Sequence, residues 1–265
     1  MAIDMSSLRR TTAKLPPRVL IYGPPGLGKT SLAAEWPNPV FLQTEDGTPA
    51  GLEIDTFGHL KSYEDVMDAM VGLLEQEHDF GAVVLDSADK FEPLVWDYTC
   101  RINKWASIEA PGYGKGYAEA DKPWREFLSL ADALRRERGM AFVHLAHSDI
   151  GRFDDPQNVS YSRYDIRLHK RALAMIQDEV DAILFLNQDV LIKEEKAGFG
   201  AKEIKAKGGG NRWLYAEGRP SFVAKNRYGL PEKFQYVLGR GYETLAPYFP
   251  SFEPVPQPAS AEPKE

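Results

Sequence analysis

The stretch Gly23–Thr30, GPPGLGKT, constrains the fold of this chain more than any other feature. It fits the pattern G-x-x-x-x-G-K-[ST] and stands between a short apolar run, residues 18–22, and a segment of helical character that begins KTSLAAEW. Glycines let such a loop curl until several backbone N–H groups point at the oxygens of a phosphate. The sequence therefore predicts a strand, a phosphate-binding loop and a helix, in that order.

We expect this loop to hold ATP with Mg²⁺. Lys29 would reach the β and γ phosphates, and Thr30 would hold Mg²⁺ through its hydroxyl group. Asp86, at the end of the apolar run AVVLD, would hold the water shell of the same metal. The predicted nucleotide-binding residues are Gly23, Pro24, Pro25, Gly26, Leu27, Gly28, Lys29, Thr30 and Ser31.

Further apolar runs of strand length cover residues 39–44, 81–86, 140–147 and 181–187, and helix-like segments near 62–76, 90–105 and 122–138 separate most of them. Apolar strands that alternate with helices are typical of a parallel sheet covered on both faces. After residue 187, alternating strands and the glycine-rich KGGGN, residues 207–211, predict an antiparallel edge or hairpin. The expected fold is α/β, a three-layer core with a mainly parallel sheet and a C-terminal antiparallel extension.

Composition favours one sizeable core within the 265 residues. The net charge of −7 argues against a uniformly basic nucleic-acid coat, although residues 193–227 gather Lys and Arg and could form a basic face. We expect an N-terminal arm over 1–17, an ATPase core over 18–250 and a disordered, proline-rich tail over 251–265. That tail is an inert extension or, less simply, a docking peptide.

Cys100 is the only cysteine, so an intrachain disulfide is excluded and a reducing compartment, the cytoplasm, is expected. The first 20 residues contain no apolar signal-peptide region, and no apolar run is long enough to span a bilayer. We therefore expect no membrane partner. With one cysteine and five histidines, a zinc site is not expected.

The base that activates the attacking water is not in its commonest position. Many ATPases carry a glutamate directly after the strand aspartate, but Ser87 stands there, so either hydrolysis is poor or the base comes from another part of the chain. Glu45, in FLQTEDG, ends the preceding apolar run on the same expected sheet edge; Asp46 is its competitor, and a solvated turn is the alternative. His147 ends another run and could sense the γ-phosphate, whereas His144, three residues away on a strand, should face the core.

The motifs GPPGLGKT, FLQTEDG, VVLDS, FVHLAHS and VAKNRYG, in this order, resemble RecA-like ATPases. They are most similar to the short phage-encoded ATP-binding proteins that act as single-strand-annealing recombinases, over about residues 18–234. The resemblance implies that Glu45 is the catalytic base, that His147 couples nucleotide to DNA loops, and that Lys225 and Arg227 enter the ATP site of a neighbouring subunit. Residues two apart on a strand share a face, so both cations could approach one phosphate.

This chain departs from full-length RecA recombinases at two points. Only 17 residues precede the first strand, so we expect a ring or filament to assemble through the core or the short arm. The strand-end His147 also replaces the glutamine found in RecA itself. If the protein is phage-encoded, its compartment would be the cytoplasm of a bacterial host.

Single-stranded DNA binding would need cations for phosphates and aromatic rings for bases. The sequence APGYGKGYAEADK predicts an extended loop, which is a DNA contact or else a flexible loop or lid. A second candidate is HSDIGRFDDPQNVSYSRY, where RecA-like proteins carry a DNA loop, although Asp154 and Asp155 would repel phosphate. The candidate DNA contacts in the two segments are Tyr113, Lys115, Tyr117, Arg152, Phe153 and Arg163. The Lys-rich segment 193–212 could equally be a solvated hairpin.

The leading functional hypothesis is a DNA-stimulated, oligomeric ATPase of phage-type recombination or annealing, which could cooperate with a single-strand-binding protein. The alternatives are a helicase-like motor or loader ATPase and a nucleotide-gated regulator that binds a protein and no DNA. A small-molecule kinase is also compatible with the phosphate loop alone. GTPases fit poorly, because NKWA lacks the aspartate of a guanine-reading N-K-x-D.

Overall fold

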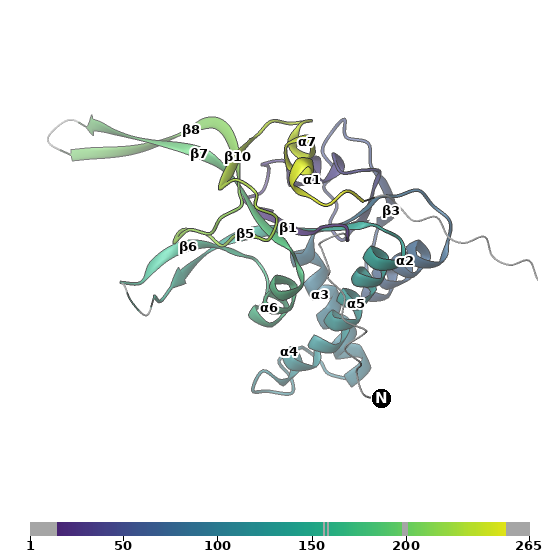
Figure 1. The fold of residues 1–265 in the computed structure, drawn as a ribbon. Coiled ribbons are helices and arrows are strands. Elements are labelled where there is room, and N and C mark those ends of the chain that lie inside the picture. Colours follow the sequence, from purple (N-terminus) through teal and green to yellow (C-terminus); the bar gives the residue numbers. More distant parts are fainter. Residues whose placement is uncertain (1–14, 156, 158, 198–200, 253–265) are drawn as a thin grey trace, which may run out of the picture.

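A computed structural model describes residues 15–155, 157, 159–197 and 201–252. Its centre is a largely parallel sheet with the strand order β10-β8-β7-β1-β5-β4-β2-β3 (Figure 1). The strands are β1 (Arg18–Gly23), β2 (Pro39–Gln43), β3 (Asp55–His59), β4 (Ala82–Asp86), β5 (Ala141–Phe153), β6 (Tyr161–Ile166), β7 (Ala182–Ala197), β8 (Ala201–Tyr215), β9 (Lys225–Asn226) and β10 (Lys233–Tyr236). The helices are α1 (Lys29–Ala34), α2 (Tyr63–Glu75), α3 (Ala88–Asn103), α4 (Lys115–Glu119), α5 (Asp121–Glu137), α6 (Lys170–Glu179), α7 (Gly241–Leu245) and the 3₁₀ helix Ala246–Tyr248.

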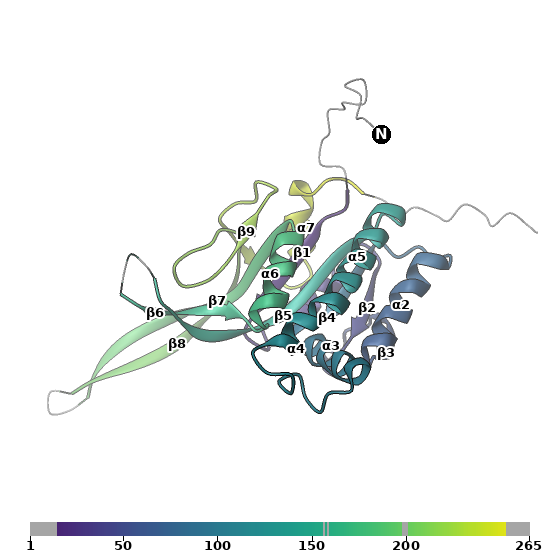
Figure 2. The ribbon, with the colours of Figure 1, turned by 90° about the horizontal axis from the view of Figure 1, so that it is seen from below.

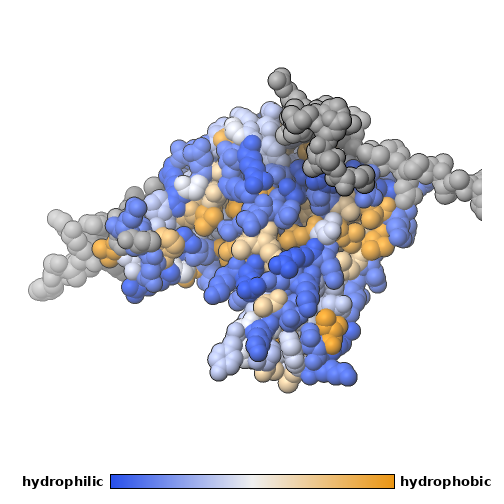
Figure 3. Space-filling model, turned by 60° about the horizontal axis from the view of Figure 1, so that its bottom comes forward, coloured by the Kyte–Doolittle hydropathy of each residue, from blue (hydrophilic) through white to orange (hydrophobic). Residues whose placement is uncertain are grey.

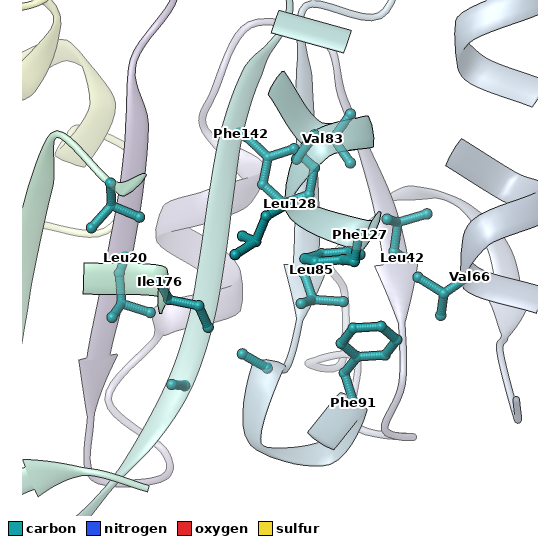
Figure 4. Packing of buried hydrophobic residues seen from close by; sticks show 14 of the residues in the cluster. Leu20, Leu42, Val66, Val83, Leu85, Phe91, Phe127, Leu128, Phe142 and Ile176 are labelled. Atoms are coloured by element: carbon teal, nitrogen blue, oxygen red, sulfur yellow. The ribbon is translucent and has the colours of Figure 1, made fainter. Parts of the chain in front are cut away.

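Helices cover the sheet on both sides. Successive side chains of a strand point to opposite faces, and in the buried strands the side chains on both faces are apolar, so both faces must be covered. One set of alternate strand residues, including Leu20, Leu85 and Phe142, packs against α2, α3, α5 and α6 (Figures 2 and 4). The other set packs against α1, α7 and Trp36 on the opposite face, and it includes Ile21. The core is therefore divided by the sheet into two layers, which confirms the predicted three-layer α/β fold.

The predicted helices and strands agree with the structure to within a few residues, apart from β7, which continues ten residues beyond the predicted end at 187, and β5, which continues six residues beyond the predicted end at 147. Its extension pairs antiparallel with β6, so Phe153 lies opposite Tyr161. The segment expected as a DNA loop is thus a β-hairpin. The edge strand β3 and the helix α6 were not predicted, because an exposed strand and a short helix leave little apolar pattern.

The C-terminal antiparallel extension is present, but its glycine run does not form the turn. β7 and β8 pair from Phe185 opposite Tyr215 to Ala197 opposite Ala201, so their connection falls among residues outside the described part of the chain. The glycines lie within β8, where the register shifts between Gln188 and Val190 and Gly210 has a φ of 75°. A glycine in this conformation suits a β-bulge. Both hairpins, β5–β6 and β7–β8, project from the same side of the molecule (Figures 1 and 2).

The loop expected to extend Tyr113, Lys115 and Tyr117 on one side is also different. Lys115–Glu119 forms α4, which follows the αL residue Gly114. Tyr113 is fully exposed, whereas the ring of Tyr117 stacks on that of His169 at 4.3 Å between centroids. A helix turns successive side chains by about 100°, so the three side chains do not share a face.

The surface toward α2, α5 and α6 is mainly hydrophilic, with small hydrophobic groups between polar ones (Figure 3). Among the described residues, no helix combines the length and apolar character that crossing a membrane would require. The arm predicted over 1–17 and the tail predicted over 251–265 lie almost entirely outside the described residues.

Candidate functional site

The loop between β1 and α1 surrounds the side chain of Lys29 with backbone carbonyl groups. Gly26 and Gly28 have φ values of 76° and 93°, which side chains rarely tolerate. The buried Lys29 donates from Nζ to the carbonyl oxygens of Gly23 and Pro24, each at 3.1 Å. Burial lowers the pKa of Lys29 although Asp86 opposes that change. The backbone of the loop thus holds the ammonium group of Lys29 inside the loop, which is where a bound phosphate would need it.

Thr30 and Asp86 meet at the carboxyl ends of β1 and β4. Thr30 Oγ1 donates to Asp86 Oδ2 over 2.8 Å. Burial raises the pKa of Asp86 to about 6, against the lowering effect of the Thr30 hydrogen bond. Hydroxyl and carboxylate oxygens are ligands that Mg²⁺ prefers, so this pair fits the predicted metal role.

Glu45 lies beside this pair, as predicted from strand order. Thr44 fixes the adjacent strand ends, because its Oγ1 donates to the Ser87 carbonyl over 2.8 Å and accepts from the Ser87 N–H over 3.0 Å. Glu45 lines the same cavity as Lys29 and Asp86, whereas its competitor Asp46 is exposed and is not among the lining residues. The structure thus brings Glu45 to the loop and leaves Asp46 outside.

His147 is held at the end of the parallel part of β5. Its Nδ1 lies 3.0 Å from Asp89 Oδ2, and its backbone N–H donates to Asp89 Oδ1 over 2.9 Å. Burial of Asp89 would raise its pKa, but the hydrogen bonds from His147 outweigh burial and the net shift is downward. By contrast, His144 is fully enclosed near Phe142, and burial lowers its pKa to about 3. His147 faces the cavity and His144 the core.

These residues line a cavity of about 380 Å³ at the carboxyl edge of the sheet. Its described lining is Gly26, Gly28, Lys29, Thr30, Ser31, Glu45, Gly47, Pro49, Asp86, His147, Arg212 and Leu238. A larger cavity of about 620 Å³ lies between β3 and α2, but it contains no residue of the phosphate loop. The candidate nucleotide site is therefore identified by the residues that line the smaller cavity, and not by cavity volume.

Comparison with known proteins agrees with this geometry. The model of a family described as AAA domain (AAA_24) matches residues 15–228, which include the whole phosphate loop and its acidic partners. The chain belongs to this AAA domain family. Among solved structures, the chain is similar to the RadB recombinase, with 16% sequence identity, coverage of 86% of this chain and 90% of that one, and a TM-score of 0.47. No curated protein matches.

In this AAA domain, Lys225 and Arg227 lie far from the loop. β9 pairs with the first residues of β7, so Asn226 is opposite Ala182, which is itself opposite Val19 at the start of β1. The phosphate loop follows the other end of β1. A role for Lys225 and Arg227 in the site of their own subunit is thereby excluded.

A buried carboxylate organises the region around Arg227. Arg227 Nη1 lies 3.4 Å from Asp181 Oδ1, and Asp181 also pairs with Arg18 at 3.3 Å and Arg135 at 3.2 Å. Although burial acts in the opposite direction, hydrogen bonding and charge from Arg18 and Arg135 lower the pKa of Asp181. Lys225 Nζ donates to the Gln177 carbonyl over 2.5 Å. This cluster could not be predicted from the sequence, because its members are far apart along the chain.

The candidate DNA contacts occupy two places. On the β5–β6 hairpin, the guanidinium of Arg163 lies 4.0 Å from the centre of the Phe153 ring and pairs with Asp165 at 2.7 Å. Arg152 is exposed and pairs with Asp154 at 3.1 Å. Tyr113, Lys115 and Tyr117 lie around α4 instead. Of the six candidate contacts, the hairpin therefore groups one aromatic and two cations, and the other three belong to the α4 region.

Sequence reasoning missed Arg212 and Tyr236, which approach the loop from β8 and β10. Both side chains lie near the position where a Cβ atom on Gly28 would stand, with Arg212 Nη1 at 3.0 Å and Tyr236 Cε1 at 3.5 Å. Arg212 is one of the Lys and Arg residues gathered in 193–227, and charge alone does not reveal which of these cations points inward. No local motif could have identified it, since only the pairing of Arg212 with Tyr236 places both beside the loop.

The residues present fit ATP with Mg²⁺. Gly26 and Gly28 add no side chain of their own to the cavity, Lys29 and Arg212 supply positive charge, and Thr30 and Asp86 supply hard oxygen ligands. Magnesium usually takes few protein ligands and keeps water and phosphate oxygens as the others. When bound, the metal would supply charge neutralisation at the phosphates.

Proposed function

We propose that this AAA domain hydrolyses ATP and acts on single-stranded DNA as an oligomer, in recombination or annealing of the phage type. One observation carries the proposal. Glu45, Lys29, Thr30 and Asp86 gather in one cavity, while Lys225 and Arg227 lie at the other end of the sheet. A subunit can then bind nucleotide alone but needs the cations of a neighbour to complete its site.

Each residue has a distinct task in this proposal. Lys29 and the loop N–H groups bind the phosphates, and Thr30 with Asp86 holds Mg²⁺. Glu45 orients the attacking water and accepts its proton. Arg227, with Lys225, places positive charge against the phosphate of the adjacent subunit, where negative charge develops.

One β-strand, β5, connects the nucleotide cavity to the hairpin that carries the proposed DNA contacts. β5 runs from His147 in the cavity to Phe153 in the β5–β6 hairpin without interruption. A shift of His147 on nucleotide binding could reach the hairpin along the backbone of β5, which pairs with β6 from Ser148 to Phe153. This arrangement supports a link between nucleotide state and the hairpin that would contact DNA, with Arg152, Phe153 and Arg163 as its contacts.

ATP turnover with and without single-stranded DNA tests this function, together with a strand-annealing assay. We expect turnover to rise on DNA addition and complementary strands to anneal faster. Unwinding or translocation without annealing would instead support a motor or loader. Turnover that is indifferent to DNA, with no strand bound at low salt, would leave the nucleotide-gated regulator as the better reading.

A further inference from the structure

Arg212 enters the nucleotide cavity from the side opposite the acidic residues. It lies on β8 opposite Gln188 of β7 and Tyr236 of β10, at the root of the long β7–β8 hairpin. In the sheet, β8 stands on one side of β1, while β4 and β2, which lead to Asp86 and Glu45, stand on the other. The phosphate loop, which follows β1, therefore lies between Arg212 and the acidic residues Asp86 and Glu45.

The guanidinium of Arg212 is in close range of the loop itself. Its Nη1 lies 3.0 Å from the position that a Cβ atom of residue 28 would occupy. Tyr236 supports the same point, since its hydroxyl donates to the Gly28 carbonyl over 3.5 Å and also bonds Glu35 over 3.2 Å. A glycine at position 28 thus serves two needs, the positive φ and the space taken by Arg212.

The charge of Arg212 is also available. Within the described part of the chain, no carboxylate forms an ion pair with it, whereas Arg163, Arg219 and Arg240 each pair with an acid. Arg212 is half-buried, and with Lys29 it forms the set of Lys and Arg side chains in the described cavity lining. A half-buried guanidinium without a carboxylate partner is suited to bind a phosphate in two-point geometry.

We propose that Arg212 binds the phosphate chain of the nucleotide held by its own subunit, from the side away from the metal. This inference rests on the proposed function, because it takes the cavity to be an ATP site. The position opposite Asp86 and Glu45 assigns Arg212 to the phosphates that ADP and ATP share, and not to the reacting γ-phosphate. It is a binding and positioning residue, distinct from Lys225 and Arg227, which would act across a subunit boundary.

Equilibrium binding of fluorescent N-methylanthraniloyl ADP and ATP tests the proposal without any turnover. We expect Arg212→Ala to weaken both nucleotides by roughly tenfold to a hundredfold, as loss of a charged hydrogen bond does, and Arg212→Lys to recover part of the affinity. Arg219→Ala is the matched control, since Arg219 pairs with Glu232 outside the cavity. Thermal unfolding of each variant confirms that it is folded.

Several outcomes would overturn the inference. Unchanged affinity in a folded Arg212→Ala variant would show that Arg212 does not bind the nucleotide. A loss for adenine nucleotides with none for the corresponding guanine nucleotides would assign Arg212 to the base. If a mixture of Arg212→Ala with Lys29→Ala regains wild-type affinity, Arg212 acts on a neighbour. A wild-type protein that binds no nucleotide would instead refute the proposed function, and the inference with it.

Discussion

Asp86 is buried at the metal side of the cavity, and burial raises its pKa from 3.8 to about 6. The folded protein therefore binds a proton more tightly here than the unfolded chain does. Between these two pKa values, raising the pH removes that proton and leaves a buried charge. The free energy of unfolding of the nucleotide-free protein consequently loses a contribution of about 3 kcal/mol as the pH rises from about 4 to above 6.

Replacing Asp86 with Asn should remove this pH dependence, because the amide does not titrate and its oxygen can still accept from Thr30. Without nucleotide, we expect Asp86→Asn to be more stable than wild type at pH 7.5 and to lose that advantage at pH 4.5. Urea unfolding at both pH values measures it. The comparison with wild type cancels the contribution of Glu92, whose pKa burial raises to about 7. Equal stability differences at the two pH values would contradict the assignment.

Glu45 and Asp46 form a natural pair for testing the base. Glu45→Gln keeps the size of the side chain in the cavity but cannot take a proton from water. We expect ATP affinity within a few-fold of wild type and turnover reduced by about a hundredfold or more. Asp46→Asn, on an exposed neighbour outside the lining, should leave turnover nearly unchanged. If the two variants behave alike, the base lies elsewhere.

Among the elements, α1 is short and depends on one carboxylate for its position. Glu35, at its C-terminus, accepts from the backbone N–H groups of Gly239 at 2.8 Å, Tyr242 at 3.0 Å and Gly241, so it binds the β10–α7 turn to the helix that carries Lys29. Removing an acceptor that serves several donors leaves them unsatisfied where water has limited access.

Glu35→Ala should therefore lower the free energy of unfolding by roughly 2–4 kcal/mol. Glu243→Ala is the control, because Glu243 is an exposed acid that pairs with Arg240 on the surface and should change stability by less than about 1 kcal/mol. Chemical denaturation of both variants provides the comparison. A Glu35→Ala loss no larger than that of Glu243→Ala would show that the turn is held by packing alone.

The β5–β6 hairpin offers a contrast between stacking and charge. If bases stack on Phe153, Phe153→Ala should weaken single-stranded DNA binding by about 1–3 kcal/mol without changing its salt dependence. Arg152→Ala should instead lower the slope of log affinity against log salt by about 1. Fluorescence anisotropy across a salt series separates them. Wild-type behaviour of both variants would exclude the hairpin as the DNA contact.

The proposed composite site predicts complementation between two inactive variants. Arg227→Ala should bind ATP and lose turnover, and Glu45→Ala should do the same for a different reason. In a mixed oligomer, a Glu45-bearing site can face a neighbour that retains Arg227, so turnover should partly return. Steady-state turnover of each variant and of the mixture measures this. No recovery would count against a shared site.

The sequence predicted those parts of the molecule that local pattern controls. The glycine loop and the buried strands determine where Lys29, Thr30 and Asp86 lie, and Glu45 followed from the common edge of parallel strands. Other features depend on pairing between distant segments. Arg212 reaches the loop only because β8 pairs with β7 and β10, and the helix α4 interrupts a glycine-rich stretch that local composition favoured as a loop.

The arginines around Asp181 have a consequence for the proposed role of Arg227. Three guanidinium groups, from Arg18, Arg135 and Arg227, share this one buried carboxylate, and Arg227 is the most exposed of them, with 53% of its side chain accessible. When Arg227 swings away, Asp181 stays neutralised by the other two. If Arg227 acts on an adjoining subunit as proposed, it can therefore leave Asp181 and return without leaving a buried carboxylate unpaired.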